Sequence, residues 1–154
     1  MMALDINEEL DKLAISFVEC YQEILFNRQL LNNDLDDAFL NLSKARSLIG
    51  CTSLSILQIP SEIEPSVFVR VDEDDDNRFQ LSSGDDETGI QKNSCSWFGL
   101  FTPQSLKTSQ KCFFKSMNVV VNLCNLQSKL KSIENDYKKA LLEKKKKFVV
   151  NLEE

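Results

Sequence analysis

The 154-residue chain contains no histidine, and this absence excludes several kinds of chemistry at once. Without histidine there is no Ser-His or Cys-His nucleophilic pair, and the commonest metal ligand is missing. The five cysteines show no C-x-x-C spacing, and no glycine-rich phosphate-binding loop lies between a strand and a helix. We therefore expect a protein that is not an enzyme and that holds neither a metal nor another cofactor.

Glycine, proline and long apolar runs are also scarce. Four glycines and three prolines indicate few tight turns. No stretch of about 18 apolar residues is available to span a bilayer, and the N-terminal segment is acidic where a secretory signal needs basic and then apolar residues. We therefore expect a protein that faces the cytosol, with reduced cysteines. The net charge of −6 argues against general binding to nucleic acid, which depends on neutralising phosphates.

Apolar residues recur in alternating steps of four and three through the first third of the chain. This spacing predicts one coiled-coil helix over about residues 5–49, with Gly50 as its C-terminal stop. The seam keeps its phase through the poor helix formers at 32–34, so we expect a continuous helix. One apolar row consists of Leu10, Phe17, Ile24, Leu31, Ala38 and Ala45, and the other of Ala14, Tyr21, Leu35, Leu42 and Ile49.

A second amphipathic helix is predicted over residues 103–148, with Pro103 in its first turn and Thr102 as its N-cap. Its apolar stripe shifts by one residue in phase near 121–126, which would turn a broader face toward a third element. Near its end lie Lys144, Lys145, Lys146 and Lys147. A solvated helix end is the favoured interpretation of this run, and contact with anionic lipid head groups is the alternative. The expected apolar face is Leu106, Phe113, Met117, Val120 and Cys124, followed by Leu123, Leu126, Leu130, Ile133, Tyr137 and Ala140.

The insert between the helices, residues 50–102, contains two prolines that exclude a long helix. Alternation over 66–71 predicts a short strand, and 78–81 is expected to pair with it across an acidic turn. That turn lacks the glycine and the closing glutamate of an EF-hand, so a solvated turn or a weak contact with a basic partner is favoured over calcium binding. Residues 82–94 are polar and acidic, which is typical of a flexible loop.

These patterns together predict a mainly α fold in a single domain over 1–154. Two long amphipathic helices are expected to form an antiparallel coiled-coil hairpin, with a small irregular and β-hairpin insert between them. Antiparallel pairing is preferred to parallel pairing because the insert can then stay local and compact.

The only tryptophan lies in an aromatic segment directly before the second helix. A hydrophobic staple that packs the loop against the helix end explains part of this segment. So many large rings around one glycine are also typical of partner-binding hot spots. For Arg46, an internal ion pair is favoured over a contact with another protein. The candidate partner-binding residues are Trp97, Phe98, Gly99, Pro103, Leu106, Lys44 and Arg46.

The same segment resembles the signature of a known family. Residues 96–106, SWFGLFTPQSL, are similar to the pattern W-F-G-x-[LF]-x-P-x-S-L of the vacuolar (V-type) ATPase assembly factors called the Vma-twenty-two family in yeast, which has an animal coiled-coil-domain-containing counterpart. Residues 42–46, LSKAR, followed by Gly50, are similar to the family pattern L-[AS]-K-A-R-x-x-x-G. The resemblance covers about residues 2–68 and 95–137, and the acidic loop between them carries no family motif.

The resemblance implies a non-catalytic, chaperone-like assembly factor for the membrane sector of the proton-pumping vacuolar ATPase. It implies peripheral attachment to the cytosolic face of the endoplasmic reticulum and early secretory membranes, through a small membrane-anchored assembly factor. The membrane-sector subunits of the pump are the further implied partners. A generic coiled-coil adaptor or tether in membrane traffic is the alternative, and it would self-associate through the long helices and give Trp97 no special role.

Overall fold

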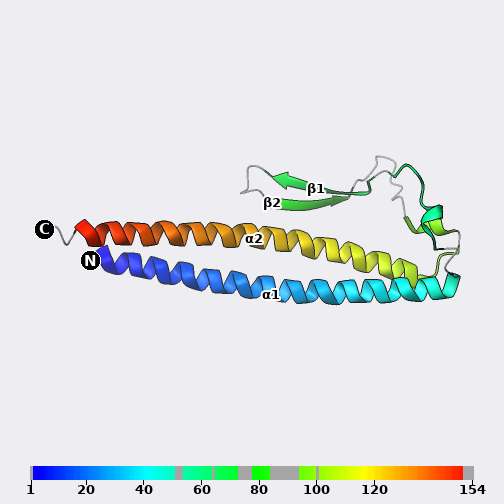
Figure 1. Ribbon diagram of the computed structural model, residues 1–154, viewed down its shortest axis with the longest axis horizontal. Coiled ribbons are helices and arrows are strands. Elements are labelled where there is room, and N and C mark those ends of the chain that lie inside the picture. The colour runs from blue at the N-terminus through cyan, green and yellow to red at the C-terminus, as the bar shows by residue number, and fades with distance from the viewer. Residues whose placement is uncertain are drawn as a thin grey trace. The chain divides into compact units, whose positions relative to one another are not determined.

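The computed structural model describes residues 2–50, 54–63, 65–72, 78–83, 94–99 and 101–150. Its elements in chain order are the helix α1 (Met2–Ile49), the 3-10 helix η1 (Ile56–Gln58), the strands β1 (Val67–Asp72) and β2 (Arg78–Ser83), the 3-10 helix η2 (Ser94–Phe98) and the helix α2 (Gln104–Val150) (Figure 1). Two long helices with a small antiparallel sheet between them in sequence confirm the predicted mainly α fold class. As expected, α1 is uninterrupted through residues 32–34.

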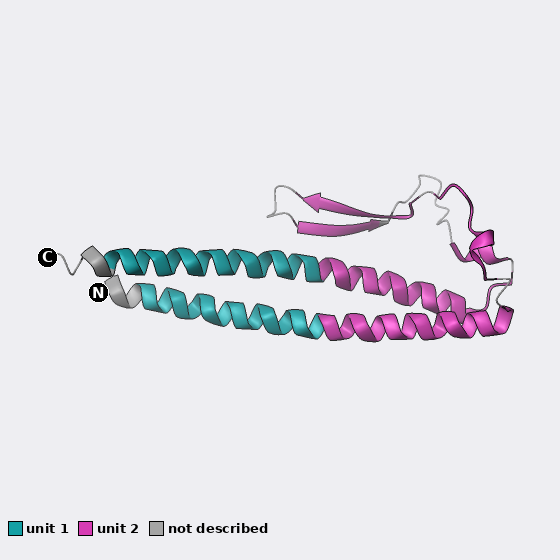
Figure 2. Cartoon of the chain, in the orientation of Figure 1, with its two compact units in different colours: residues 1–27, 123–154 teal, residues 28–122 magenta. Residues whose placement is uncertain are grey.

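The chain divides into two compact units, and each long helix contributes to both (Figure 2). Unit 1 consists of Met1–Asn27 and Leu123–Glu154, and unit 2 consists of Arg28–Asn122. No helix in the described part of the chain is both long enough and apolar enough to cross a membrane.

In unit 1 the first part of α1 packs against the last part of α2. The buried core there is Ile6, Leu10 and Ala140, with Leu13, Tyr137 and Leu141 packed against it. Further along α1, the thiol of Cys20 donates to the carbonyl of Leu126 at 3.5 Å. Residues further along α1 contact residues that come earlier in α2. The two helix segments of this unit are therefore antiparallel, as predicted.

In unit 2 the helix segments are antiparallel as well, and small residues allow them to approach closely. Ala38 is fully buried, and its carbonyl accepts a hydrogen bond of 2.8 Å from the hydroxyl of Ser109. The rings of Phe39 and Phe113 meet edge to face, with centroids 5.2 Å apart. A side-chain hydroxyl that reaches the backbone of the opposite helix leaves no room for a large residue at that level.

The sequence places one of the two apolar rows of α1 incorrectly. The first row is largely right, since Leu10, Ile24, Ala38 and Ala45 are buried. In the second row Ala14 and Tyr21 are exposed, whereas Ile6, Cys20 and Asp34 are buried, one residue earlier in the heptad. From residue 35 onward the predicted row, Leu35, Leu42 and Ile49, is half-buried. The row that the structure has instead contains polar residues at positions 27, 34 and 41, so it does not show the apolar spacing by which a seam is recognised.

The apolar stripe of α2 changes phase earlier than predicted. Met117 and Val120 are 37% and 43% exposed, and Ser116 and Val119 are buried instead. The two buried positions are three residues apart where the regular alternation requires four, so the shift falls at 116–119 rather than at 121–126. The hydroxyl of Ser116 donates to the carbonyl of Cys112 in its own helix at 3.0 Å, which satisfies it where it is buried.

The insert contains the predicted hairpin. β1 and β2 pair antiparallel, with Val69 opposite Leu81 and Val71 opposite Phe79. The loop predicted at 82–94 is too long at both ends. Residues 82 and 83 belong to β2, and Ser94 is the first residue of η2. Residues 84–93 of that loop and the predicted acidic turn lie outside the described residues.

The second helix begins one residue later than predicted. The carbonyl of Pro103 accepts from the amides of Leu106 and Lys107 at 3.0 and 3.4 Å. Pro103 therefore occupies the N-cap position that was assigned to Thr102, because an N-cap carbonyl accepts the first helical hydrogen bond.

Candidate partner-binding site

The candidate site lies in unit 2, where α1 ends and α2 begins. Gly50 stops α1 with a φ of +88°, and its amide donates to the carbonyl of Arg46 at 3.0 Å. Glycine adopts this left-handed conformation without steric cost, and such a residue is the usual end of a helix. The predicted C-terminal stop is confirmed.

A short 3-10 helix, η2, is held against the start of α2 through a cysteine. Cys95 is 4% exposed, and its thiol donates to the side-chain carbonyl of Gln110 at 3.1 Å. Burial raises the pKa of the Cys95 thiol, and the charge of Lys107 opposes this only in part. The thiol therefore stays protonated at neutral pH and remains a donor. Cys95 lies in an irregular insert without apolar periodicity, so the sequence pattern does not predict this structural role.

Six side chains form what we call the tip cluster. Ala45, Cys95 and Leu106 are buried in it, and Leu42, Leu54 and Phe98 pack against them. Ala45 is fully buried, so there is no space on this side of α1 for a larger residue. The structure thus brings Phe98 and Leu106 of the predicted site together, and both act as packing residues at this level.

Trp97 and Gly99 lie on either side of Phe98. Trp97 is half-buried and is not among the six members of the tip cluster. Gly99 ends η2 with a φ of +105°, and its amide donates to the carbonyl of Ser96 at 3.3 Å. The sharp turn at Gly99 takes the chain away from the cluster after Phe98, so the next aromatic residue is not packed with it.

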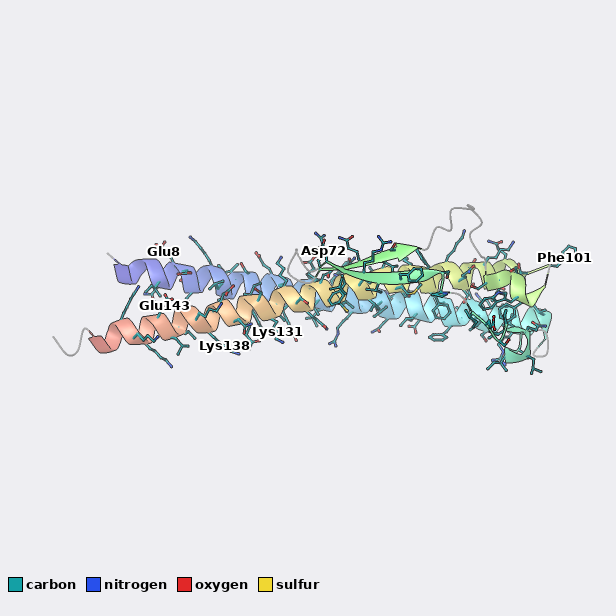
Figure 3. The ribbon with its side chains drawn as sticks, turned by 90° about the horizontal axis from the view of Figure 1, so that it is seen from above. Glu8, Asp72, Phe101, Lys131, Lys138 and Glu143 are labelled. Carbon is teal, nitrogen blue, oxygen red and sulfur yellow. The ribbon has the colours of Figure 1, made fainter. Side chains whose placement is uncertain are left out.

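That aromatic residue is Phe101, which is 97% exposed and whose ring points away from the ribbon (Figure 3). Other large apolar side chains of the same unit are similarly uncovered: Leu48 is 73%, Ile56 is 81% and Leu57 is 91% exposed. We call these four the exposed tip residues. None of the four is among the site residues that the sequence predicts, although Phe101 lies inside the W-F-G segment. Leu48, Ile56 and Leu57 lie within ten residues of one another in sequence, and Phe101 follows in the same compact unit. Large apolar side chains left in solvent are candidates for an interaction surface where they gather into one patch.

The two basic candidates stay outside the tip cluster. Lys44 and Arg46 are exposed on either side of the buried Ala45. Neither forms an ion pair with another residue in the part of the chain that the structure describes. The internal ion pair expected for Arg46 is therefore not seen among the described residues, and both charges face solvent.

Comparison with known proteins yields relatives that share most of this chain. No family model matches the chain. The vacuolar ATPase assembly protein VMA22 of Homo sapiens is 25% identical, and the similarity covers 84% of this chain and 88% of the relative. The protein of the same name from Mus musculus is also 25% identical, with 81% and 85% covered, and that from Danio rerio is 23% identical, with 95% of each chain covered. These similarities confirm the family resemblance drawn from the motifs, which is to the vacuolar ATPase assembly factors of the VMA22 family.

Proposed function

We propose that the protein is a vacuolar ATPase assembly factor that acts by binding other proteins and not by catalysis. The names and the wide coverage of the relatives support the assembly role. The observation that supports action through binding is the near-complete exposure of Phe101 beside a packed W-F-G segment. A ring of this size exposes a large apolar area to water, and its burial by a partner would be favourable by about 1.5–3 kcal/mol.

The W-F-G segment has an inward and an outward part. Phe98 packs into the tip cluster and fixes η2 to the helices, while Phe101, beyond the turn at Gly99, is left in solvent. A rigid base that presents exposed rings loses little conformational freedom on binding, which favours affinity. Trp97 lies at the boundary between the two parts, and we assign its exposed portion to the partner.

The finer parts of the proposal concern the partner and the place of action. We propose that the protein works at the cytosolic face of the endoplasmic reticulum with a small membrane-anchored assembly factor, and that together they bind membrane-sector subunits of the pump. The exposed Lys144, Lys145, Lys146 and Lys147 would add attraction to anionic lipid head groups, at about 1 kcal/mol for each residue near the surface. The family resemblance supports this arrangement, and the exposed tip residues supply a surface for it.

Affinity purification from gently solubilised internal membranes, followed by mass spectrometry, tests the proposal. The wild-type chain should recover pump membrane-sector subunits together with a small membrane protein. The double variant Phe101→Ser, Leu57→Ser should lose them while its thermal unfolding stays normal, because both side chains are exposed. Leu142→Ser is the matched control, since Leu142 is a 57% exposed leucine of unit 1, and it should retain the partners.

The adaptor alternative makes the opposite prediction for the same experiment. Recovery of tethering or coat proteins without pump subunits would refute the assembly role. Normal recovery of pump subunits by the double variant would leave the assembly role intact and would show that the exposed tip residues are not its binding surface.

A further inference from the structure

The segment of α1 from residue 13 to residue 26 is apolar over most of its circumference. Ten of its fourteen residues are apolar, and the four polar residues are Ser16, Glu19, Gln22 and Glu23. A helix that is hydrophobic nearly all round is normally buried on several sides, since a helix with one partner needs only one apolar stripe.

Unit 1 covers only one side of this segment. Cys20 and Ile24 are 3% and 5% exposed, and Cys20 contacts α2 directly. Five other apolar residues are largely open to solvent: Ile15 is 59%, Val18 is 53%, Tyr21 is 49%, Leu25 is 49% and Phe26 is 70% exposed. These five residues, which we call the outer face, lie in the interior of a long helix and not in a loop.

Three residues of the outer face form a continuous row along the helix. Val18, Tyr21 and Leu25 follow one another at steps of three and four, so they stand above each other on consecutive turns. Ile15 and Phe26 are eleven residues apart, which is close to three full turns, and they lie along one edge of this row. The surface therefore has the length and the spacing that a second helix requires.

Carboxylates border this surface. Glu8, Ile15, Glu19 and Phe26 are separated by seven, four and seven residues and so follow a single line along the helix. Glu8, Asp11 and Glu19 are exposed, and none of them is ion-paired within the described parts of the chain. Lys12 is the single basic residue of α1 between residues 6 and 27. The side chains of α1 that border the outer face are thus predominantly negative.

We propose that the outer face binds an amphipathic helix of another protein, one that carries lysine or arginine beside its apolar stripe. A second copy of this chain is disfavoured because pairing through the outer face would place two rows of carboxylates together. An anionic lipid surface is disfavoured on this face of α1, because the same carboxylates would repel it. The inference does not depend on the identity of the assembly pathway, because it uses only the burial and charge of the α1 segment of unit 1.

Site-specific photocrosslinking of the full chain in cells tests this proposal. p-Benzoylphenylalanine would replace Phe26, and a control chain would carry it at Lys138, an exposed residue of α2 in the same unit (Figure 3). Mass spectrometry of the crosslinked peptide should identify a segment of another protein with apolar residues at helical spacing and flanking Lys or Arg. The Lys138 position should give no such product.

Charge reversal provides the second arm. Glu8→Lys combined with Glu19→Lys should reduce the crosslink yield at position 26 by about tenfold or more, because the like charges then repel the partner. Both residues are exposed, so the thermal midpoint should be unchanged, and Glu8→Gln with Glu19→Gln should give an intermediate yield.

Four outcomes would overturn the proposal. The first is a crosslink from position 26 to a second copy of the chain, together with a concentration-dependent mass in sedimentation. The second is binding to phosphatidylserine vesicles that a Val18→Ser change abolishes. The third is a crosslink yield from position 138 equal to that from position 26, and the fourth is no crosslink at all. Loss of pump-subunit recovery in the tip variants has no bearing on these results, so failure of the proposed function and failure of this inference can be told apart.

Discussion

Replacement of Ser109 by leucine should destabilise unit 2 by about 2–4 kcal/mol. Ser109 is 1% exposed and its hydroxyl reaches the carbonyl of the fully buried Ala38 at 2.8 Å. Loss of this hydrogen bond alone costs about 1 kcal/mol, since the carbonyl lies within α1 and keeps its helical partner. The additional carbons of leucine must also be accommodated beside the fully buried Ala38, and overpacking of this kind costs about 1–3 kcal/mol.

Urea unfolding followed by circular dichroism at 222 nm measures both contributions. Ser109→Ala should lower the free energy of unfolding by about 1 kcal/mol, and Ser109→Leu by the larger amount. Ser43→Leu is the matched control, because Ser43 is an exposed helical serine in the same unit, and it should stay within about 0.5 kcal/mol of wild type. If Ser109→Leu were as stable as the control, the close approach of the two helices at this level would be refuted.

Three further predictions concern charge, backbone conformation and thiol reactivity. A hydrogen bond to Asp34 raises the pKa of Lys115 above its ordinary 10.5. The stability from this pair should therefore be complete below that value and should disappear as the pH rises through the folded pKa. The urea midpoint should decrease more between about pH 8 and 11.5 in wild type than in Lys115→Met. Gly99→Ala should cost about 1–2 kcal/mol in the same unfolding assay, from the φ of +105° alone, since a Cβ there meets no atom within 4 Å. Iodoacetamide should modify Cys95 at least about tenfold more slowly in the native protein than in urea, because burial raises the pKa of its thiol and keeps the reagent from the sulfur. Mass spectrometry follows the rate of modification. Equal rates in the two conditions would contradict the place of Cys95 in the tip cluster.

The positions and ends of the main elements are readable from the sequence, because they depend on recurring patterns and on residues that mark boundaries. The seam through Leu10, Ile24 and Ala38, the glycine at position 50 and the alternation over 66–71 each repeat or mark a boundary, and the structure has the corresponding helix, stop and strand. Which residues fill the second row is not readable in this way. Asp34 is 7% exposed and hydrogen-bonded to Lys115 across the pair, so a charged residue occupies a position where a pattern search expects an apolar one.

For the candidate site, the sequence indicates the segment but not which of its side chains pack inward. The W-F-G segment is conspicuous because large rings surround one glycine. The neighbouring sequence does not indicate which of these rings is buried. Phe98 is held by Ala45 and Leu106, residues about 50 positions before it and 8 after it, whereas Phe101 meets solvent after the turn at Gly99. The outer face of α1 is not readable from the sequence for a related reason: the apolar spacing predicts Tyr21 in the seam with α2, whereas the structure leaves it 49% exposed.

The contacts between the helices close loops of very different length, and this has a consequence for synthesis. Cys95 and Gln110 are 15 residues apart along the chain, Ala38 and Ser109 are 71 apart, and Cys20 and Leu126 are 106 apart. Closing longer loops costs more entropy, so the tip cluster is expected to form before the helix pairing of unit 1. During translation the apolar stretch around Val18 leaves the ribosome about a hundred residues ahead of the α2 segment that covers its inner side. For that interval both sides of this stretch are open, and a partner helix synthesised nearby would meet it without competition from the chain's own second helix.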